Sequence, residues 1–171
     1  MRTTGGLPAA LLVLGSLAVG CGSASPASPP TGIDELVVPT PSPDPDDFVA
    51  EIDNPWFPTS DRPEDEPVPT ARVAGVEVAV LDGDYFAQDR RGNVWWFGTE
   101  GEWEAGVDGA EAGLAMPAEP RYGDSWRTAY APGVVEDVAA VVEMDEDTLV
   151  LETTSPLEPG LPERRTVEKA D

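Results

Sequence analysis

The sequence contains no histidine, a single cysteine and very few basic residues. Its 171 residues include 10 lysines and arginines against 33 aspartates and glutamates, which gives a formal net charge of -23. Without histidine, the chain lacks the side chain that best suits proton transfer near neutral pH and that most often binds metals. Any catalysis would therefore have to use carboxylates, serine, tyrosine or the single lysine, Lys169.

The excess of carboxylates also limits the partners of this protein. A surface of this charge repels phosphate backbones and anionic headgroups, which disfavours nucleic-acid binding and docking on a membrane through a basic patch. The charge is compatible with a cationic, neutral or small-molecule ligand, and we expect no cofactor. Because Cys21 is the only cysteine, it has no disulfide partner within the chain, and cysteine pairing says nothing about the compartment.

The first 21 residues have the layout of a secretory signal peptide. Arg2 precedes an apolar run over residues 7–19, which is shorter than the roughly 20 apolar residues of a membrane-spanning helix. Residues 17–21, Leu-Ala-Val-Gly-Cys, resemble the lipobox of bacterial lipoproteins, in which the leader is cleaved before an acylated cysteine. This pattern predicts a signal peptide over 1–20, a lipid such as palmitate on Cys21, and a protein anchored at the extracytoplasmic face of the cell membrane. An ordinary signal peptide followed by an incidental cysteine is the alternative.

Residues 21–47 are predicted to form a disordered tether that begins at the lipidated Cys21. The segment is rich in proline, serine and aspartate, and such a composition cannot bury enough apolar surface to offset the entropy of ordering. Prolines alternate with other residues between positions 39 and 45, a pattern that favours extended polyproline II geometry. The tether would hold the following domain, predicted over residues 48–171, away from the membrane.

This domain is predicted to be all-β, with a single antiparallel, strongly curved sheet or a partly open barrel. Apolar residues with period-two spacing over 72–81 predict two short strands or one bulged strand, with Gly75 at the turn or bulge. The valines of 134–144 also match helical spacing, but their β-branched side chains favour a strand. Further strands are expected over 85–88, 93–98, 102–107, 122–130, 148–154 and 164–168.

The stretch over residues 82–103 is the expected centre of the domain, because it holds six of the twelve aromatic residues. Its middle predicts a hairpin turn. Gly92 or Asn93 can adopt the positive φ that such turns require, and Asp89 can accept hydrogen bonds from the turn amides.

Three consecutive aromatic residues follow this turn. Side chains alternate along a strand, which places Trp95 and Phe97 on one face and Trp96 on the other. A strand that is apolar on both faces is typical of the covered centre of a sheet. We therefore expect these aromatic residues to be core residues, whereas an exposed face on Trp96 or Trp103 would indicate a binding surface.

A set of motifs within residues 50–168 resembles an uncharacterised family of secreted bacterial proteins and lipoproteins. The motifs are Asn-Pro-Trp-Phe-Pro at 54–58, Phe-Ala-Gln-Asp-Arg-Arg-Gly-Asn-Val-Trp-Trp-Phe at 86–97, Glu-Trp-Glu-Ala-Gly-Val-Asp-Gly at 102–109, Met-Pro through Gly-Asp-Ser-Trp at 116–126, and Pro-Leu-Glu-Pro-Gly at 156–160. The resemblance implies an exported protein and brings no established activity. Such relatives carry an additional strand after the first motif and an extension after the last, so an incomplete sheet edge is expected here.

Together these features predict a membrane-anchored extracytoplasmic lipoprotein with a non-catalytic binding or envelope-associated role. Cys21 is its lipidation site, and no catalytic, cofactor-binding or metal-binding residue is assigned. Two alternatives stay open: a carboxylate-dependent hydrolase acting on envelope glycans, and a divalent-cation-dependent binding module. The acidic turns at 82–89 and 145–147 prompt the second alternative, although neither has the spacing of an EF-hand loop.

Overall fold

The computed structural model describes residues 44–49, 51–57 and 67–170. The predicted signal peptide over 1–20, the predicted lipidation site Cys21 and nearly all of the predicted tether lie outside these ranges, so they stay predictions. The described part begins with a 3-10 helix, η1 (Pro45–Asp47), which Asp44 caps by accepting a hydrogen bond from the amide of Asp46 at 3.0 Å. No helix in these ranges has the length and apolar character that a membrane crossing requires.

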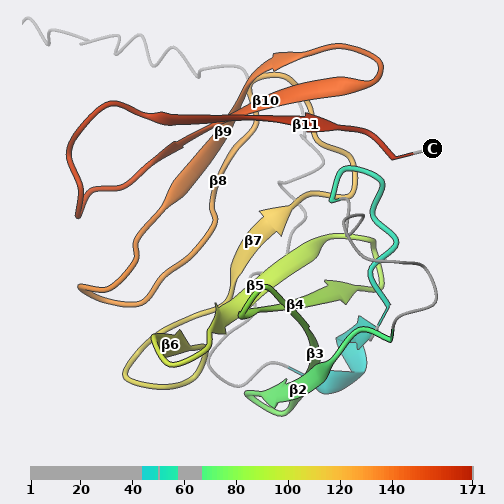
Figure 1. Cartoon of the computed structure of the whole chain (residues 1–171), viewed down its shortest axis with the longest axis vertical. Helices are drawn as coiled ribbons and strands as arrows, with labels where there is room; N and C mark the ends of the chain where they lie inside the picture. Colours follow the sequence, from blue (N-terminus) through green and yellow to red (C-terminus); the bar gives the residue numbers. More distant parts are fainter. Residues whose placement is uncertain (1–43, 50, 58–66, 171) are drawn as a thin grey trace, which may run out of the picture.

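Seven strands form the first set of the fold (Figure 1). They are β1 (Phe48–Val49), β2 (Thr70–Val73), β3 (Val76–Leu81), β4 (Asp84–Asp89), β5 (Val94–Thr99), β6 (Trp103–Glu104) and β7 (Gly113–Met116). Their order is β2-β3-β4-β5-β6, with β1 also paired to β4 and β7 to β5. All these pairs are antiparallel, and β5 is the strand that carries the three consecutive aromatic residues.

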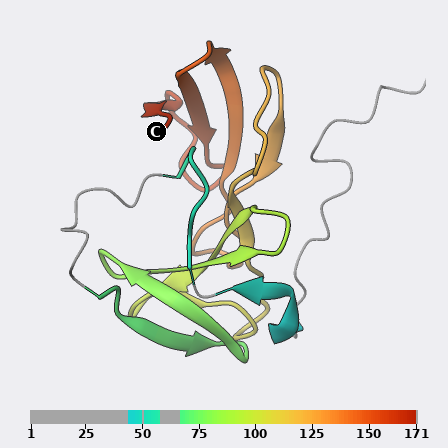
Figure 2. The same cartoon turned by 90° about the vertical axis from the view of Figure 1, so that its right-hand side faces the viewer.

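Four strands form the second set, which stands over the first in Figure 2. They are β8 (Ser125–Arg127), β9 (Val138–Met144), β10 (Thr148–Thr154) and β11 (Glu163–Glu168), in the order β11-β10-β9-β8. Their pairs are also antiparallel, with a register shift between β9 and β10 at Val150 and Leu151.

The two sets meet where the chain before β7 lies beside the chain after β8. The amide of Glu111 donates to the carbonyl of Tyr130 at 2.8 Å, and this bridge links the sets. Arg127 pairs with Glu111 and lies over the Tyr130 ring at 4.5 Å from its centroid. The result is one strongly curled antiparallel half-barrel, which confirms the all-β class and the curved, partly open architecture.

The main hydrophobic core fills the inside of this curl. Its large members come from both sets of strands: Val78, Trp95, Phe97, Leu114 and Met116 from the first, and Trp126, Val141, Leu149, Leu151 and Val167 from the second. Burial of such a side chain contributes about 1.5 to 3 kcal/mol, so packing between the sets is what holds the half-barrel together.

Strand β5 packs against other residues on both faces, but only one face is fully buried, so the prediction that Trp96 is a core residue holds only in part. Trp95 and Phe97 are buried in the main core, whereas Trp96 points the other way and is only partly buried. Trp96 packs against a second, smaller cluster made of Trp103, Ala110, Ala129 and Ala131. The opposite faces of one strand therefore serve two different clusters.

Several turns differ from the predicted strand limits for local reasons. Of the two alternatives predicted for residues 72–81, the structure shows two strands joined by a turn, because Ala74 and Gly75 both have positive φ. The strand predicted over 102–107 shrinks to β6, because Gly106 and Asp108 have positive φ and turn the chain.

The strand predicted over 122–130 is also too long. It is reduced to β8, because Gly123 has a φ of 89° and the chain before Ser125 forms a turn. The Tyr122 side chain is 74% exposed, whereas Trp126 is buried in the core, so the two do not share a face. Residues 134–144 do form a strand, but it begins only at Val138.

Candidate functional site

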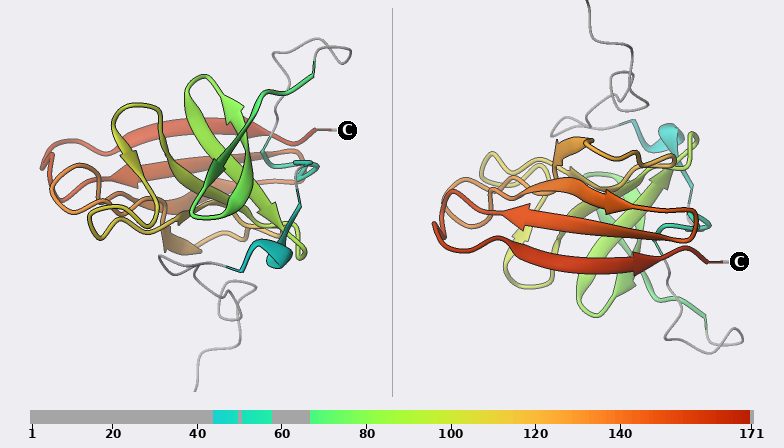
Figure 3. Two further views of the ribbon diagram at one scale, coloured as in Figure 1. Left: turned by 90° about the horizontal axis from the view of Figure 1, so that it is seen from below. Right: turned by 90° about the horizontal axis from the view of Figure 1, so that it is seen from above.

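A groove of about 780 Å³ lies on the Trp96 face of β5. Its walls come from residues 96–103 of the first strand set, residues 133–137 before β9, and residues 153–163 around the loop that joins β10 to β11. Figure 3 shows this loop at the end of the molecule opposite the C-terminus. The groove therefore forms where the ends of the two strand sets come together.

The β10–β11 loop owes its shape to proline. Pro156, Pro159 and Pro162 have fixed φ and no amide hydrogen, so this segment cannot continue the β10–β11 ladder. The loop exposes two leucines, Leu157 at 41% and Leu161 at 98%. These leucines give the groove an apolar rim on one side.

Trp96 forms the aromatic wall of the groove. Its ring stacks on Phe86 with centroids 6.4 Å apart and meets Trp103 edge-on at 5.3 Å. Its Nε1 donates to the carbonyl of Gly98 at 2.8 Å, which fixes the orientation of the ring. Trp103 is buried, so the partly exposed aromatic surface in the groove belongs to Trp96.

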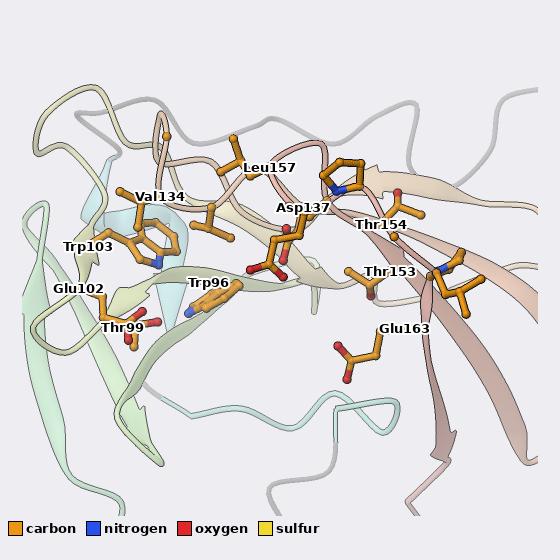
Figure 4. Close-up of a pocket in the computed structure, with 18 residues that line it drawn as sticks. Trp96, Thr99, Glu102, Trp103, Val134, Asp137, Thr153, Thr154, Leu157 and Glu163 are labelled. Atoms are coloured by element: carbon orange, nitrogen blue, oxygen red, sulfur yellow. The ribbon is translucent and has the colours of Figure 1, made fainter.

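Four carboxylates line the groove, and none of its described lining residues is basic. They are Glu102, Asp137, Glu158 and Glu163. Figure 4 shows the carboxylates of Asp137 and Glu163 directed toward the space that Trp96 borders. Within the described ranges, the ion pairs of Arg121, Arg127 and Arg164 go to carboxylates outside the groove. A concave site with one sign of charge concentrates counter-ions, so this groove attracts cations.

The acidic turn at 82–89 has a structural role. Asp89 accepts hydrogen bonds from the amide of Arg91 at 2.8 Å and from the amide of Asn93 at 3.0 Å, as the sequence predicts. Gly92 adopts the positive φ of this turn. Asp84 accepts from the Thr99 hydroxyl at 2.6 Å. These carboxylates hold the hairpin together.

The acidic turn at 145–147 is organised in the same way. Asp145 accepts hydrogen bonds from the amide of Asp147, from the Thr148 hydroxyl and from the Thr148 amide, and these bonds hold the pKa of its carboxyl below its ordinary value. In the part of the chain that the structure describes, no group of three or more His, Cys, Asp or Glu side chains is arranged to hold a metal ion.

The groove could not be predicted from the sequence, because its lining residues lie far apart along the chain. The sequence predicts Trp96 to be a core residue, and none of the motifs includes Asp137 or Glu163. The one available signal was Pro-Leu-Glu-Pro-Gly at 156–160, which places an exposed leucine and a carboxylate in a proline-rich turn. Cys21, the assigned lipidation site, lies outside the described residues.

The fold and the groove define a class of protein: a small all-β half-barrel with an acidic, tryptophan-walled groove at one end. Comparison of the chain with protein-family models, with curated proteins and with solved structures finds no match. The chemistry of the groove itself is therefore the basis for assigning a function.

Proposed function

We propose that this protein is a membrane-anchored extracytoplasmic lipoprotein that binds a cationic ligand without catalysis. The observation that supports this proposal is the composition of the groove, in which a partly exposed Trp96 ring and four carboxylates meet with no basic residue in the lining. The lipobox at 17–21 and the proline-rich segment after it support anchoring on a tether.

The groove offers a cation two kinds of attraction. A cation over an exposed tryptophan ring gains about 0.5 to 1 kcal/mol. Each exposed carboxylate that pairs with it adds about 0.2 to 1 kcal/mol. For a ligand with several cationic groups, four such pairs and one ring supply on the order of 1 to 5 kcal/mol, which corresponds at best to submillimolar affinity. A physiological ligand with tighter binding therefore needs contacts beyond charge.

The test is a titration of the full chain with ligands of similar size and different charge, followed by tryptophan fluorescence. Spermine, a neutral polyol and citrate represent the three classes. We expect a saturable change with spermine alone, because only a cation gains from both the carboxylates and the Trp96 ring. The ligand is expected to be released chemically unchanged, which mass spectrometry checks.

Two matched double variants test whether the groove is the binding site for spermine. Asp137→Asn with Glu163→Gln removes two groove carboxylates, and we expect spermine affinity to fall by about 2- to 30-fold. Glu77→Gln with Glu146→Gln removes the same charge from exposed positions outside the groove and should change affinity much less. Equal losses in the two double variants would show nonspecific attraction to the net charge and would refute the proposal.

A further inference from the structure

We infer that the ligand of this groove is an extended peptide segment that combines basic and apolar residues. This inference rests on the proposed function and specifies the ligand of the same site. It follows from three features of the groove: an exposed apolar rim, carboxylates spread along its length, and hydroxyl and carbonyl groups suited to a peptide backbone.

The apolar rim is formed by Val134, Leu157 and Leu161. They are 57%, 41% and 98% exposed, and they face the same groove from two different loops. Among the described residues, only five other large hydrophobic side chains are exposed, and none of them lines this groove. Apolar groups of a ligand that pack on these side chains would remove apolar surface from water, which favours binding.

The carboxylates are distributed along the groove rather than gathered at one point. In Figure 4, Glu102 lies at the Trp103 end, Asp137 in the middle and Glu163 at the β11 end. A single ammonium group can pair with one of these positions at a time. A chain with several basic side chains spread along its length can pair with more than one of these positions at once.

Polar groups between these charges suit a peptide backbone. Thr153, Thr154 and Ser155 line the groove at the end of β10, and a hydroxyl can both donate and accept hydrogen bonds. Pro159 and Pro162 also line the groove and lack amide hydrogens, so at these positions the backbone offers carbonyl acceptors alone. Backbone amides and lysine or arginine side chains are donors that match these acceptors.

The negative charge of the groove repels two other candidate ligands. A second copy of this chain carries the same net charge of -23, and an acidic segment would be repelled in the same way. A polyamine can pair with the carboxylates but leaves the apolar rim exposed to water. A basic segment with apolar residues between its charges satisfies both features at once.

The experiment compares three probes of equal charge on the full chain at physiological ionic strength. They are amidated Lys-Val-Lys-Val-Lys-Val, amidated Lys-Ser-Lys-Ser-Lys-Ser, and spermine. We expect the valine peptide to bind about tenfold or more tightly than the other two, because its apolar side chains cover the leucine rim. Calorimetry gives the dissociation constant of each probe.

Variants of the rim test the contact directly. The double variant Leu157→Ser with Leu161→Ser should lower the affinity for the valine peptide about tenfold and leave the affinities for the serine peptide and spermine unchanged. Both leucines are exposed, so the fold should tolerate the change, and Val107→Ser, exposed by 51% outside the groove, is the control. If all three probes bind alike and lose affinity in Asp137→Asn with Glu163→Gln, the peptide inference is wrong and the proposed function stands. If no probe depends on the groove carboxylates, both are wrong.

Discussion

At the residue scale, Asp89 joins the hairpin turn to the hydrophobic core. One carboxylate oxygen accepts from the turn amides of Arg91 and Asn93, and the other accepts from Asn93 Nδ2 at 2.9 Å and from Trp95 Nε1 at 3.0 Å. Trp95 is only 2% exposed, so its indole nitrogen needs an internal partner. A single side chain thus fixes both the turn and the largest core residue of β5.

Replacement of Asp89 by alanine should lower the free energy of unfolding by about 2 to 4 kcal/mol. The variant leaves the buried indole nitrogen without an acceptor and removes the bonds to the turn amides. Asp89→Asn keeps one acceptor oxygen, so its free energy of unfolding should fall by less than that of Asp89→Ala. Urea denaturation measures both, with Glu77→Ala, an exposed residue of β3, as the control. Equal stability of Asp89→Ala and Glu77→Ala would contradict this role.

At the element scale, the half-barrel depends on close contact between β7 and the chain that follows β8. A Cβ atom on Gly113 would lie 2.6 Å from the amide nitrogen of Ala129 and closer still to the carbonyl of Thr128. No side chain fits there without moving the backbone. The same segment carries the bridge between Glu111 and Tyr130, so this glycine allows the two strand sets to meet.

Gly113→Ala should therefore destabilise the protein by about 2 kcal/mol or more, because the added methyl group forces the two backbones apart. Gly160→Ala is a matched control, since no atom lies within 3.4 Å of its added Cβ and its φ is not positive. The control should change stability by less than about 0.5 kcal/mol. Urea unfolding followed by tryptophan fluorescence measures both variants, and similar losses would refute the steric argument.

At the scale of the whole molecule, residues 51–57 pack at the end of the half-barrel near the C-terminus, and the groove lies at the opposite end (Figure 3). Trp56 is buried in the main core, and Lys169 Nζ lies 5.5 Å from its ring centroid. The amide of Ala170 donates to the carbonyl of Pro55 at 2.8 Å, which holds the end of β11 against this segment.

Cys21→Ala should move the protein from the membrane fraction to the soluble fraction. The predicted lipid supplies the anchor, since each buried methylene contributes about 0.8 kcal/mol and two or three acyl chains hold firmly where one is marginal. Fractionation and labelling with a palmitate analogue measure the outcome, and Glu77→Gln serves as a control that keeps the cysteine. Unchanged membrane association in Cys21→Ala would refute lipidation at this residue.

The sequence by itself determined the features that depend on neighbouring residues. The strand class follows from period-two spacing, and the hairpin follows from Gly92 and Asp89, because turn conformation is set within a few residues. The opposite orientations of Trp95 and Trp96 follow from alternation along the strand. The acidic net charge also belongs to the sequence alone, whereas lipidation at Cys21 stays a prediction.

Only the tertiary structure decided which distant residues share a surface. The groove brings Trp96 together with Asp137 and Glu163 from another strand set, and no local pattern relates their positions. The need for glycine at 113 likewise depends on the Thr128 and Ala129 backbone that packs against it. The physical reason is that the burial of a side chain is set by the whole fold. Trp96 is only partly buried because a groove separates its ring from the β10–β11 loop, and the sequence around Trp96 does not specify that arrangement.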